Sequence, residues 1–216
     1  MKGPLVVFDM DGVLVGPRSS WRIVHEHFGT SNEESFLAYM QGEIDDLEFM
    51  RRDIALWKDF MEEPGIGRIN DVLDRVEPMK GFHKAMKDLR SAGFSLIIIS
   101  GGLDLLADRL MELGGFNGSF ANGISKGKDG QIDGEGILRV PLRDKGSVMK
   151  GLKGYGPIAA VGDSLVDIPM FRKADISIAF RPENEEVASS ADHVVDEPDL
   201  TIVSDLILRE IGAKQQ

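Results

Sequence analysis

A chain of 216 residues, 42% of them hydrophobic, is long enough to bury one core and carry a smaller insert. Its 25 basic and 36 acidic residues give a formal net charge of −11, which disfavours a nucleic-acid or anionic-membrane partner. Because the sequence contains no cysteine, disulfides, thiolate nucleophiles and cysteine-ligated zinc are excluded.

The first apolar run, Leu5–Phe8, opens a series of five expected strands. It is too short for a signal peptide or a membrane span, so we expect a cytoplasmic protein without a membrane partner. The run Ile97-Ile98-Ile99 has no polar alternation, which is typical of a parallel strand buried on both faces. Helical patterns follow most of these runs, so the sequence predicts an α/β fold with a doubly wound (Rossmann-like) parallel sheet. The other four expected strands are Phe94–Ile99, Ile158–Val161, Ile176–Phe180 and His193–Val195.

Residues 16–78 interrupt this alternation with helical patterns and no strand. Apolar residues recur there at helical spacing in four stripes, which predicts a small four-helix cap domain over the strand ends. Ser31, with Glu34 three residues later, predicts a capping box at the start of the second cap helix. The α/β core domain would then consist of residues 1–15 and 79–216.

A second, smaller interruption runs from residue 117 to residue 141. Its Lys128-Asp129-Gly130 turn lies between Ile124 and Ile132, and a turn of this kind between two apolar positions predicts a β-hairpin insert.

Polar residues follow three of the expected strands, where ligands bind in open α/β sheets. Asp9 and Asp11 follow the first strand. In an extended segment, alternate residues point to the same side, so both carboxylates can face one site. Ser100 and Gly101 follow the second strand just before a helix, where a hydroxyl and free N–H groups suit a phosphate. Asp163 follows the third strand.

Two further residues complete the pattern. Asp167 comes four residues after Asp163, and Lys145 lies in a polar loop just before a predicted helix that contains Leu152. Each group alone is typical of a turn or a solvated surface. Their combination, in order and at strand ends or helix starts, is far less expected by chance than any one of them alone.

This series of residues resembles the haloacid dehalogenase (HAD) superfamily. Its four motifs are matched in order by residues 9–13, Ser100, Lys145 and residues 162–167, over nearly the whole chain. The helical insert after the first strand, together with Phe120-Ala121-Asn122 and the hairpin that follows, is similar to the phosphoserine-phosphatase-like branch.

The resemblance implies a magnesium-dependent phosphatase that forms an aspartyl-phosphate at Asp9. Asp11 would protonate the leaving oxygen and later accept a proton from water. The Asp9 carboxylate, the Asp11 backbone carbonyl and the Asp163 carboxylate would bind Mg²⁺, and Asp167 would orient a metal-bound water.

The resemblance also implies that Ser100, the Gly101 amide and Lys145 bind the remaining phosphate oxygens. The partner would be a small phosphomonoester, and the protein a monomer or a homodimer. Two alternatives share these residues. One is a phosphotransferase or phosphomutase; the other is a receiver-like signalling domain, which the chain length and the helical insert disfavour.

Substrate choice depends on three charged residues. Phosphoserine phosphatases place an acidic residue soon after the first motif and an arginine on a cap helix. Ungapped spacing puts Arg18 and Asp53 at those positions, so the charges are exchanged. Asp46 lies two helical turns before Asp53, on the same predicted face. We expect these residues to select another small phosphomonoester, whose hydroxyls donate to Asp46 and Asp53. Alternatively, the three charges are solvated, and a slip of one residue would put Arg52 at the arginine position.

Overall fold

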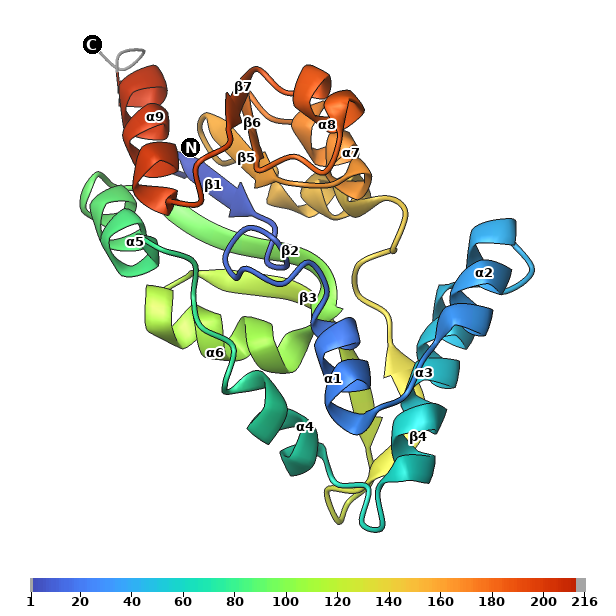
Figure 1. The fold of residues 1–216 in the computed structure, drawn as a ribbon. Coiled ribbons are helices and arrows are strands. Elements are labelled where there is room, and N and C mark those ends of the chain that lie inside the picture. Colours follow the sequence, from blue (N-terminus) through green and yellow to red (C-terminus); the bar gives the residue numbers. More distant parts are fainter. Residues whose placement is uncertain (1, 213–216) are drawn as a thin grey trace.

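Residues 2–212 are described by the computed structural model, and their strands form one seven-stranded sheet (Figure 1). The order is β4-β3-β2-β1-β5-β6-β7, and all neighbours are parallel except the antiparallel pair β3–β4. The strands are Leu5–Phe8 (β1), Ser95–Leu103 (β2), Gly118–Lys126 (β3), Ile132–Ile137 (β4), Ile158–Gly162 (β5), Ile176–Phe180 (β6) and His193–Val195 (β7).

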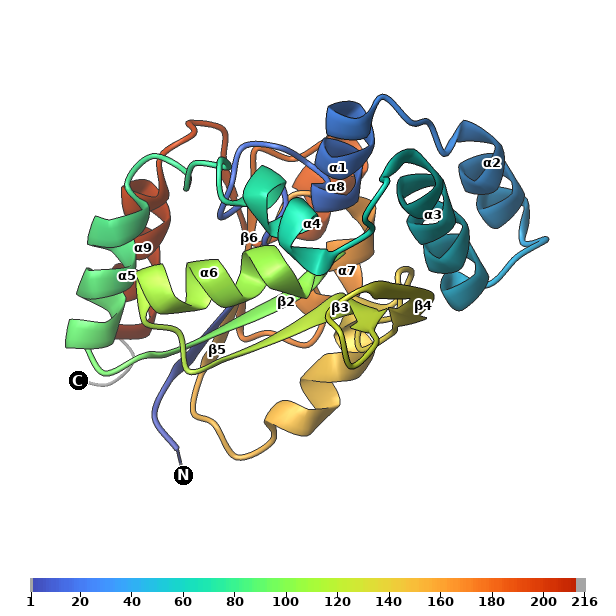
Figure 2. The ribbon, with the colours of Figure 1, turned by 90° about the horizontal axis from the view of Figure 1, so that it is seen from below.

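Both faces of the sheet are covered, which confirms the predicted doubly wound α/β core. Val6 and Phe8 of β1 belong to one apolar cluster, whereas Leu5 and Val7 belong to a second cluster on the opposite face. Figure 2 shows α6 on one side of the sheet and η1 on the other. The first cluster includes residues of α5 (Phe82–Ser91), α6 (Asp104–Gly114) and α9 (Leu200–Gly212), and the second includes residues of η1 (Lys145–Leu152), α7 (Ile168–Phe171) and α8 (Glu185–Ser190).

The helix predicted after Lys145 is a 3₁₀ helix, η1, and it begins at Lys145 itself. Gly146 and Gly151 lower the α-helical propensity of this segment. A side chain at Gly146 would also lie 2.4 Å from the Pro169 carbonyl oxygen, so glycine is needed for the close approach.

Four helices lie between β1 and α5, within residues 16–78, as the apolar stripes predict. α2 ends at Gly42, whose φ of 79° forms the left-handed cap. The predicted capping box is wrong, because the N-cap of α2 is Asn32, whose side-chain amide instead donates to Asp53 of α3. No helix in residues 2–212 is long and apolar enough to cross a membrane. The four helices are α1 (Ser20–Phe28), α2 (Glu33–Gln41), α3 (Asp46–Phe60) and α4 (Ile66–Leu73).

The apolar side of these helices is continuous with the core. Val24 of α1, Trp57 of α3 and Ile69 of α4 belong to the same cluster as Leu106 of α6. The chain crosses between the two parts at Val15 and Pro78, which form an isolated antiparallel bridge. The division into a core domain (1–15 and 79–216) and a cap domain (16–78) stays a prediction.

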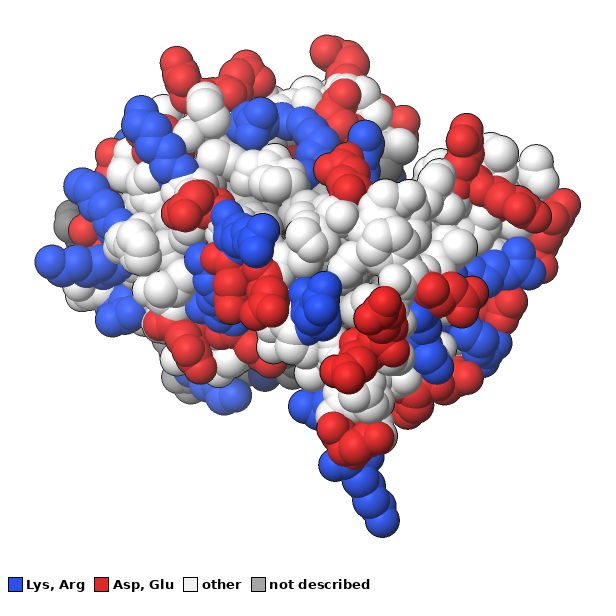
Figure 3. Space-filling view, turned by 60° about the horizontal axis from the view of Figure 1, so that its bottom comes forward, with Lys and Arg blue, Asp and Glu red and all other residues white. Residues whose placement is uncertain are grey.

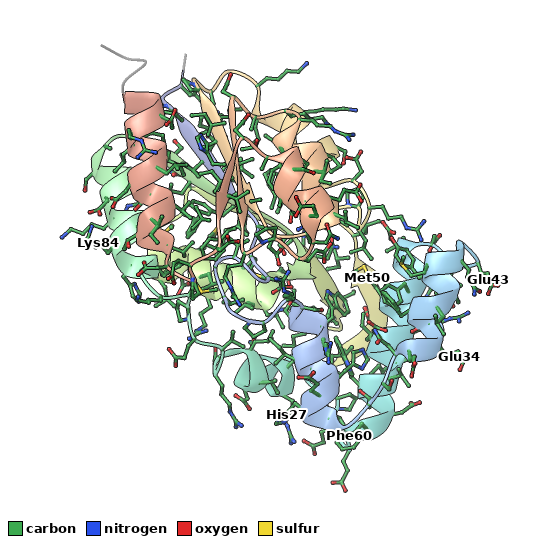
Figure 4. The ribbon with its side chains drawn as sticks, turned by 45° about the horizontal axis from the view of Figure 1, so that its top comes forward. His27, Glu34, Glu43, Met50, Phe60 and Lys84 are labelled. Carbon is green, nitrogen blue, oxygen red and sulfur yellow. The ribbon has the colours of Figure 1, made fainter. Side chains whose placement is uncertain are left out.

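The predicted hairpin consists of β3 and β4, and it supports the cap. β3 begins earlier than the turn signal suggested, because its first half pairs in parallel with β2. β4 contacts α3, where a side chain at Gly136 would lie 2.8 Å from the Met50 side chain (Figure 4). Arg51 of α3 also pairs with Glu135 of β4 at 3.0 Å. The hairpin therefore links the sheet edge to the cap.

Candidate active site

Asp9, Ser100 and Asp163 lie at the carboxyl ends of three adjacent strands. Asp9 follows β1, Ser100 lies in the last part of β2, and Asp163 follows β5. β1 lies between β2 and β5 in the sheet, so parallel pairing brings the three residues to one edge. Each residue is at most 2% exposed.

Lys145 lies among the carboxylates of this site. Its Nζ is 2.8 Å from Asp9 Oδ1 and 2.8 Å from Asp167 Oδ1. Burial lowers the pKa of Lys145, but the charges of Asp167 and Asp9 outweigh burial, so the net shift is upward. Lys145 is therefore a buried ammonium group that contacts Asp9 directly.

Asp167 organises the loop that carries Asp163. Its Oδ2 accepts hydrogen bonds from the Asp163 amide (3.0 Å), the Ser164 amide (2.9 Å) and the Ser164 hydroxyl (2.8 Å). The bond from the Ser164 amide is one half of a capping box at the 3₁₀ turn η2 (Leu165–Asp167), and the Ser164 side chain accepts from the Asp167 amide in return. With Oδ1 bonded to Lys145, both oxygens of Asp167 hold other parts of the site in place.

Three carboxylates form a cluster with the chemistry of a cation site. Asp9, Asp163 and Asp167 offer oxygens that all lie within 4.8 Å of one another. Burial, and then the charge of Asp167, raise the pKa of Asp9, and the same two causes raise the pKa of Asp163 to about 7. Even with Lys145 among them, buried carboxylates in this arrangement suit a divalent cation, which prefers oxygen ligands. Gly12 permits the approach, because its φ is +79° and a Cβ there would lie 2.2 Å from Asp163 Oδ2.

Asp11 has one oxygen held and one free. Its Oδ2 accepts from the Ser20 amide and the Ser20 hydroxyl, both at 2.9 Å. Its Oδ1 is buried and has no hydrogen-bond partner among the described residues. Burial raises the pKa of Asp11, against the opposing effect of the two Ser20 bonds. A buried carboxyl with a raised pKa and a free oxygen can hold a proton for transfer to a ligand.

The end of β2 brings backbone and hydroxyl groups next to Asp11. The Ser100 hydroxyl accepts from the Gly102 amide at 3.1 Å, and the Ser20 hydroxyl accepts from the Leu103 amide at 2.9 Å. A Cβ on Gly102 would lie 2.4 Å from Asp11 Oδ2, so only glycine allows this approach. The segment lies directly before α6, where backbone N–H groups suit an anion.

Asn122 holds two parts of the site together. Its side-chain amide donates to the Val140 carbonyl at 2.9 Å and to the Gly101 carbonyl at 3.3 Å. Its oxygen accepts from the amides of Arg139 and Val140, each at 2.8 Å. The fully buried Asn122 thus connects the end of β2 to the chain that leads to Lys145.

Comparison with known proteins identifies the family. A model of haloacid dehalogenase-like hydrolases matches residues 6–172, and a second model of the same description matches residues 156–207. The chain belongs to the haloacid dehalogenase-like hydrolases. It is 30% identical to a phosphoserine phosphatase of Streptococcus thermophilus over 217 residues, covering 96% of this chain and 97% of that protein. It is 29% identical to a phosphoserine phosphatase of Methanocaldococcus jannaschii over 187 residues, covering 83% and 86%.

Solved structures in this family share the fold. The phosphoserine phosphatase of T. onnurineus, in complex with NDSB-201, superposes with a TM-score of 0.71 at 27% identity, covering 95% of this chain and 94% of that one. A substrate-bound phosphoserine phosphatase has a TM-score of 0.77 at 24% identity, covering 95% and 99%, and shows likeness of fold alone. The phosphoserine-phosphatase-like branch of the HAD superfamily, predicted from the motifs, is therefore confirmed.

Of the three residues expected to choose the substrate of this HAD protein, Arg18 contacts the carboxylate cluster. Its Nη1 lies 2.6 Å from Asp163 Oδ2, and its Nη2 donates to the Arg181 carbonyl at 2.8 Å. Asp46 is half-buried, and its oxygens accept from the Tyr39 hydroxyl (2.8 Å) and the Leu142 amide (3.1 Å).

Asp53 is buried inside the cap, with 2% of its surface exposed. Its Oδ2 accepts from the Asn32 side chain at 2.9 Å and lies 3.3 Å from His25 Nε2. The Ser35 hydroxyl donates weakly to Oδ1 at 3.5 Å. Helix neighbours thus occupy both oxygens of Asp53, which removes the structural basis for a substrate hydroxyl there. We therefore do not assign Asp53 to substrate recognition.

Proposed function

We propose that this HAD-type phosphatase hydrolyses a small phosphomonoester through an aspartyl-phosphate at Asp9. The observation that carries the proposal is the pairing of a buried Asp9 with the Lys145 ammonium, beside an Asp11 whose Oδ1 is buried and free. A nucleophile, a fixed cation and a proton donor are the three parts that phosphoryl transfer to a carboxylate needs.

In the first half-reaction, an Asp9 carboxylate oxygen attacks phosphorus and the bond from phosphorus to the ester oxygen breaks. Asp11 gives its proton to that oxygen, and the alcohol leaves. In the second half-reaction, water attacks the phosphorus of the aspartyl-phosphate, and Asp11 takes the proton from that water. The bond from phosphorus to the Asp9 oxygen breaks, which restores the Asp9 carboxylate and releases inorganic phosphate. The two bonds from Ser20 hold Asp11 in one orientation through both transfers.

We propose Mg²⁺ as the metal, held by the carboxylates of Asp9 and Asp163 and by the Asp11 backbone carbonyl. The cation would neutralise the charge of these carboxylates and of the phosphate, so that two anions can meet. Asp167, whose oxygens are bonded to Lys145, Asp163 and Ser164, keeps the Asp163 loop in place.

Lys145, the Ser100 hydroxyl and the Gly101 amide are proposed to bind the phosphate oxygens that do not react. Charge on these oxygens changes during transfer, and groups held in place beforehand stabilise it most. Lys145 is held by Asp167, and Gly101 is held through its carbonyl by Asn122 and by Trp21 Nε1 at 3.1 Å. On the face seen in Figure 3, basic and acidic side chains are interspersed, which fits a small-molecule partner better than a polyanion.

Removal of divalent metal tests the reaction class. We expect release of inorganic phosphate from a panel of small phosphomonoesters with Mg²⁺, loss of that activity in EDTA, and its return when Mg²⁺ is added in excess. Phosphate release also separates a hydrolase from a phosphotransferase, which would pass the group to a second alcohol. Full activity in EDTA would contradict the proposed site.

Exchange of Asp11 for Asn tests the proton donor. Because an amide has no proton to give, Asp11→Asn should lower kcat/KM for alkyl phosphates by about 10²–10⁴-fold. With p-nitrophenyl phosphate, whose leaving group needs no proton, a phosphoenzyme should form and then hydrolyse slowly.

The pH profile gives a second readout for Asp11. Donation needs the protonated carboxyl, so kcat/KM of the wild-type protein should fall as pH rises through the raised pKa of Asp11. Asp11→Asn should lose that limb. An unchanged profile in the variant would assign the proton to another group.

A further inference from the structure

Arg18 reaches the site from the loop between β1 and α1. Its guanidinium bridges Asp163 Oδ2 (2.6 Å) and the Arg181 carbonyl (2.8 Å). The Arg18 side chain is 45% exposed, whereas that of Asp163 is 3% exposed. A guanidinium has five N–H donors, and these two bonds use two of them. Arg18 is thus fixed at the rim of the site with donors left over.

The carbonyl that holds Arg18 comes from an unusual backbone conformation. Arg181, directly after β6, has a φ of 49°, the only positive value at a non-glycine residue in the described part of the chain. Its amide is held by the Val195 carbonyl at 2.7 Å. Such a conformation costs free energy and persists where its surroundings enforce it, often beside a functional site.

Arg18 also belongs to the turn that positions the proton donor. The Gly12 amide donates to the Pro17 carbonyl at 2.7 Å, which closes the loop. Ser20, two residues after Arg18, holds Asp11. An ester bound at Asp9, with its leaving oxygen at the free Asp11 Oδ1, would extend its remaining atoms toward this loop. Arg18 is the cation that the loop offers there, and Asp163 ties it to the cluster that contains Asp9.

We infer that Arg18 selects a leaving group that carries a carboxylate, so that the substrates are phosphate esters of small hydroxy acids. This inference rests on the phosphatase function proposed above. A substrate carboxylate can share the guanidinium with Asp163, because the free N–H donors suit a planar anion. An ammonium group at the same place would meet the charge of Arg18. The expected hydroxyl contact to Asp53 is replaced by this charge contact.

Four phosphate esters distinguish the effect of a substrate carboxylate from that of a substrate ammonium group. O-phosphoserine carries a carboxylate and an ammonium; 3-phosphooxypropanoate carries the carboxylate alone; phosphoethanolamine carries the ammonium alone; ethyl phosphate carries neither. At saturating Mg²⁺ we expect the highest kcat/KM for 3-phosphooxypropanoate, about 10- to 100-fold above ethyl phosphate. Phosphoethanolamine should be the poorest substrate, and O-phosphoserine should fall below 3-phosphooxypropanoate.

Arg18→Gln should lower kcat/KM for 3-phosphooxypropanoate about 10- to 100-fold and affect ethyl phosphate much less. Arg22→Gln is the matched control, because Arg22 is 79% exposed on α1 and pairs with Glu26. Arg22→Gln should leave kcat/KM unchanged for all four esters. Calorimetric titration with Mg²⁺ alone reports any effect of either change on metal affinity.

Binding gives the same comparison without turnover. In the Asp9→Asn background with Mg²⁺, 3-phosphooxypropanoate should bind more tightly than ethyl phosphate, and Arg18→Gln should remove the difference. No turnover of any ester by the wild-type protein would contradict the phosphatase function, while the binding series would still decide the role of Arg18. An equal loss for all four esters in Arg18→Gln, or a preference for O-phosphoserine, would overturn the inference.

Discussion

Asp9→Asn is expected to abolish phosphatase turnover, by roughly 10⁴-fold or more, while the fold remains intact. An amide oxygen is a poor nucleophile toward phosphorus and a weaker ligand for a divalent cation. The Asn oxygen can still accept from Lys145 and from the Met10 amide, which lies 2.7 Å from Asp9 Oδ1. The loss would therefore come from chemistry and not from a rearranged site.

The stability of this variant separates chemistry from folding. Burial and the charge of Asp167 raise the pKa of Asp9 in the folded protein. At pH values between the pKa of Asp9 in the unfolded chain and its raised pKa in the fold, the folded protein therefore binds more protons than the unfolded chain. Stability then falls as pH rises through that window, so the raised pKa of Asp9 is a cost to the metal-free fold at the upper end of the window. Asn removes this cost, so the thermal midpoint of the metal-free variant should be equal to or above that of the wild type.

A matched control is Asp74→Asn, because the Asp74 side chain is 65% exposed. Its ion-pair contact, from Oδ1 to Arg109 Nε, is long at 3.8 Å. Asp74→Asn should leave both turnover and thermal midpoint unchanged. Turnover by Asp9→Asn at a tenth of the wild-type rate, after deamidation is excluded by mass spectrometry, would rule out Asp9 as the nucleophile.

The positions of Asp9, Ser100 and Asp163 could be predicted from the sequence because parallel strands end at one edge of a sheet. Three short apolar runs followed by polar residues were sufficient to predict these positions, although no single run indicates the order of the strands in the sheet. The parallel pairing of β3 with β2 was missed, because the polar start of β3, Gly118-Ser119, carries no strand pattern.

Contacts between distant segments could not be predicted in the same way. Ser20 donates to Asp11 from nine residues away. The sequence around Ser20 indicates only the start of a helix, because Ser19 is the N-cap of α1. Asp46 and Asp53 share a helix spacing, but their partners come from the packing of α1 and α2 against α3. Spacing along one helix indicates that two residues share a face, but it does not identify the residues that this face contacts.

The role of Lys145 required the family resemblance, since a lysine in a polar loop is usually solvated. The structure places it 4% exposed between two carboxylates, and this burial determines what its removal does. Asn122 holds the segment before Lys145 next to the site, because its oxygen accepts from the amides of Arg139 and Val140.

Lys145→Met is expected to lower kcat/KM by about 10²–10³-fold, because the phosphate loses a fixed cation in a buried site. It should also destabilise the metal-free protein by about 3–5 kcal/mol, because Asp9 and Asp167 are left buried without their shared counter-charge. Lys150→Met is the control within the same 3₁₀ segment: Lys150 is exposed, and its loss should change neither quantity.

The double variant Lys145→Met/Asp167→Asn distinguishes the two effects. Asn at position 167 removes one buried negative charge, while its oxygen can still accept from Asp163 and Ser164. Stability measured by urea unfolding should therefore recover in large part, whereas kcat/KM should stay low because no cation returns to the phosphate. Recovery of activity together with stability would mean that Lys145 supports the fold only. Wild-type kcat/KM in Lys145→Met alone would remove Lys145 from the phosphate site, and a loss confined to activity would show that the carboxylates do not depend on its charge.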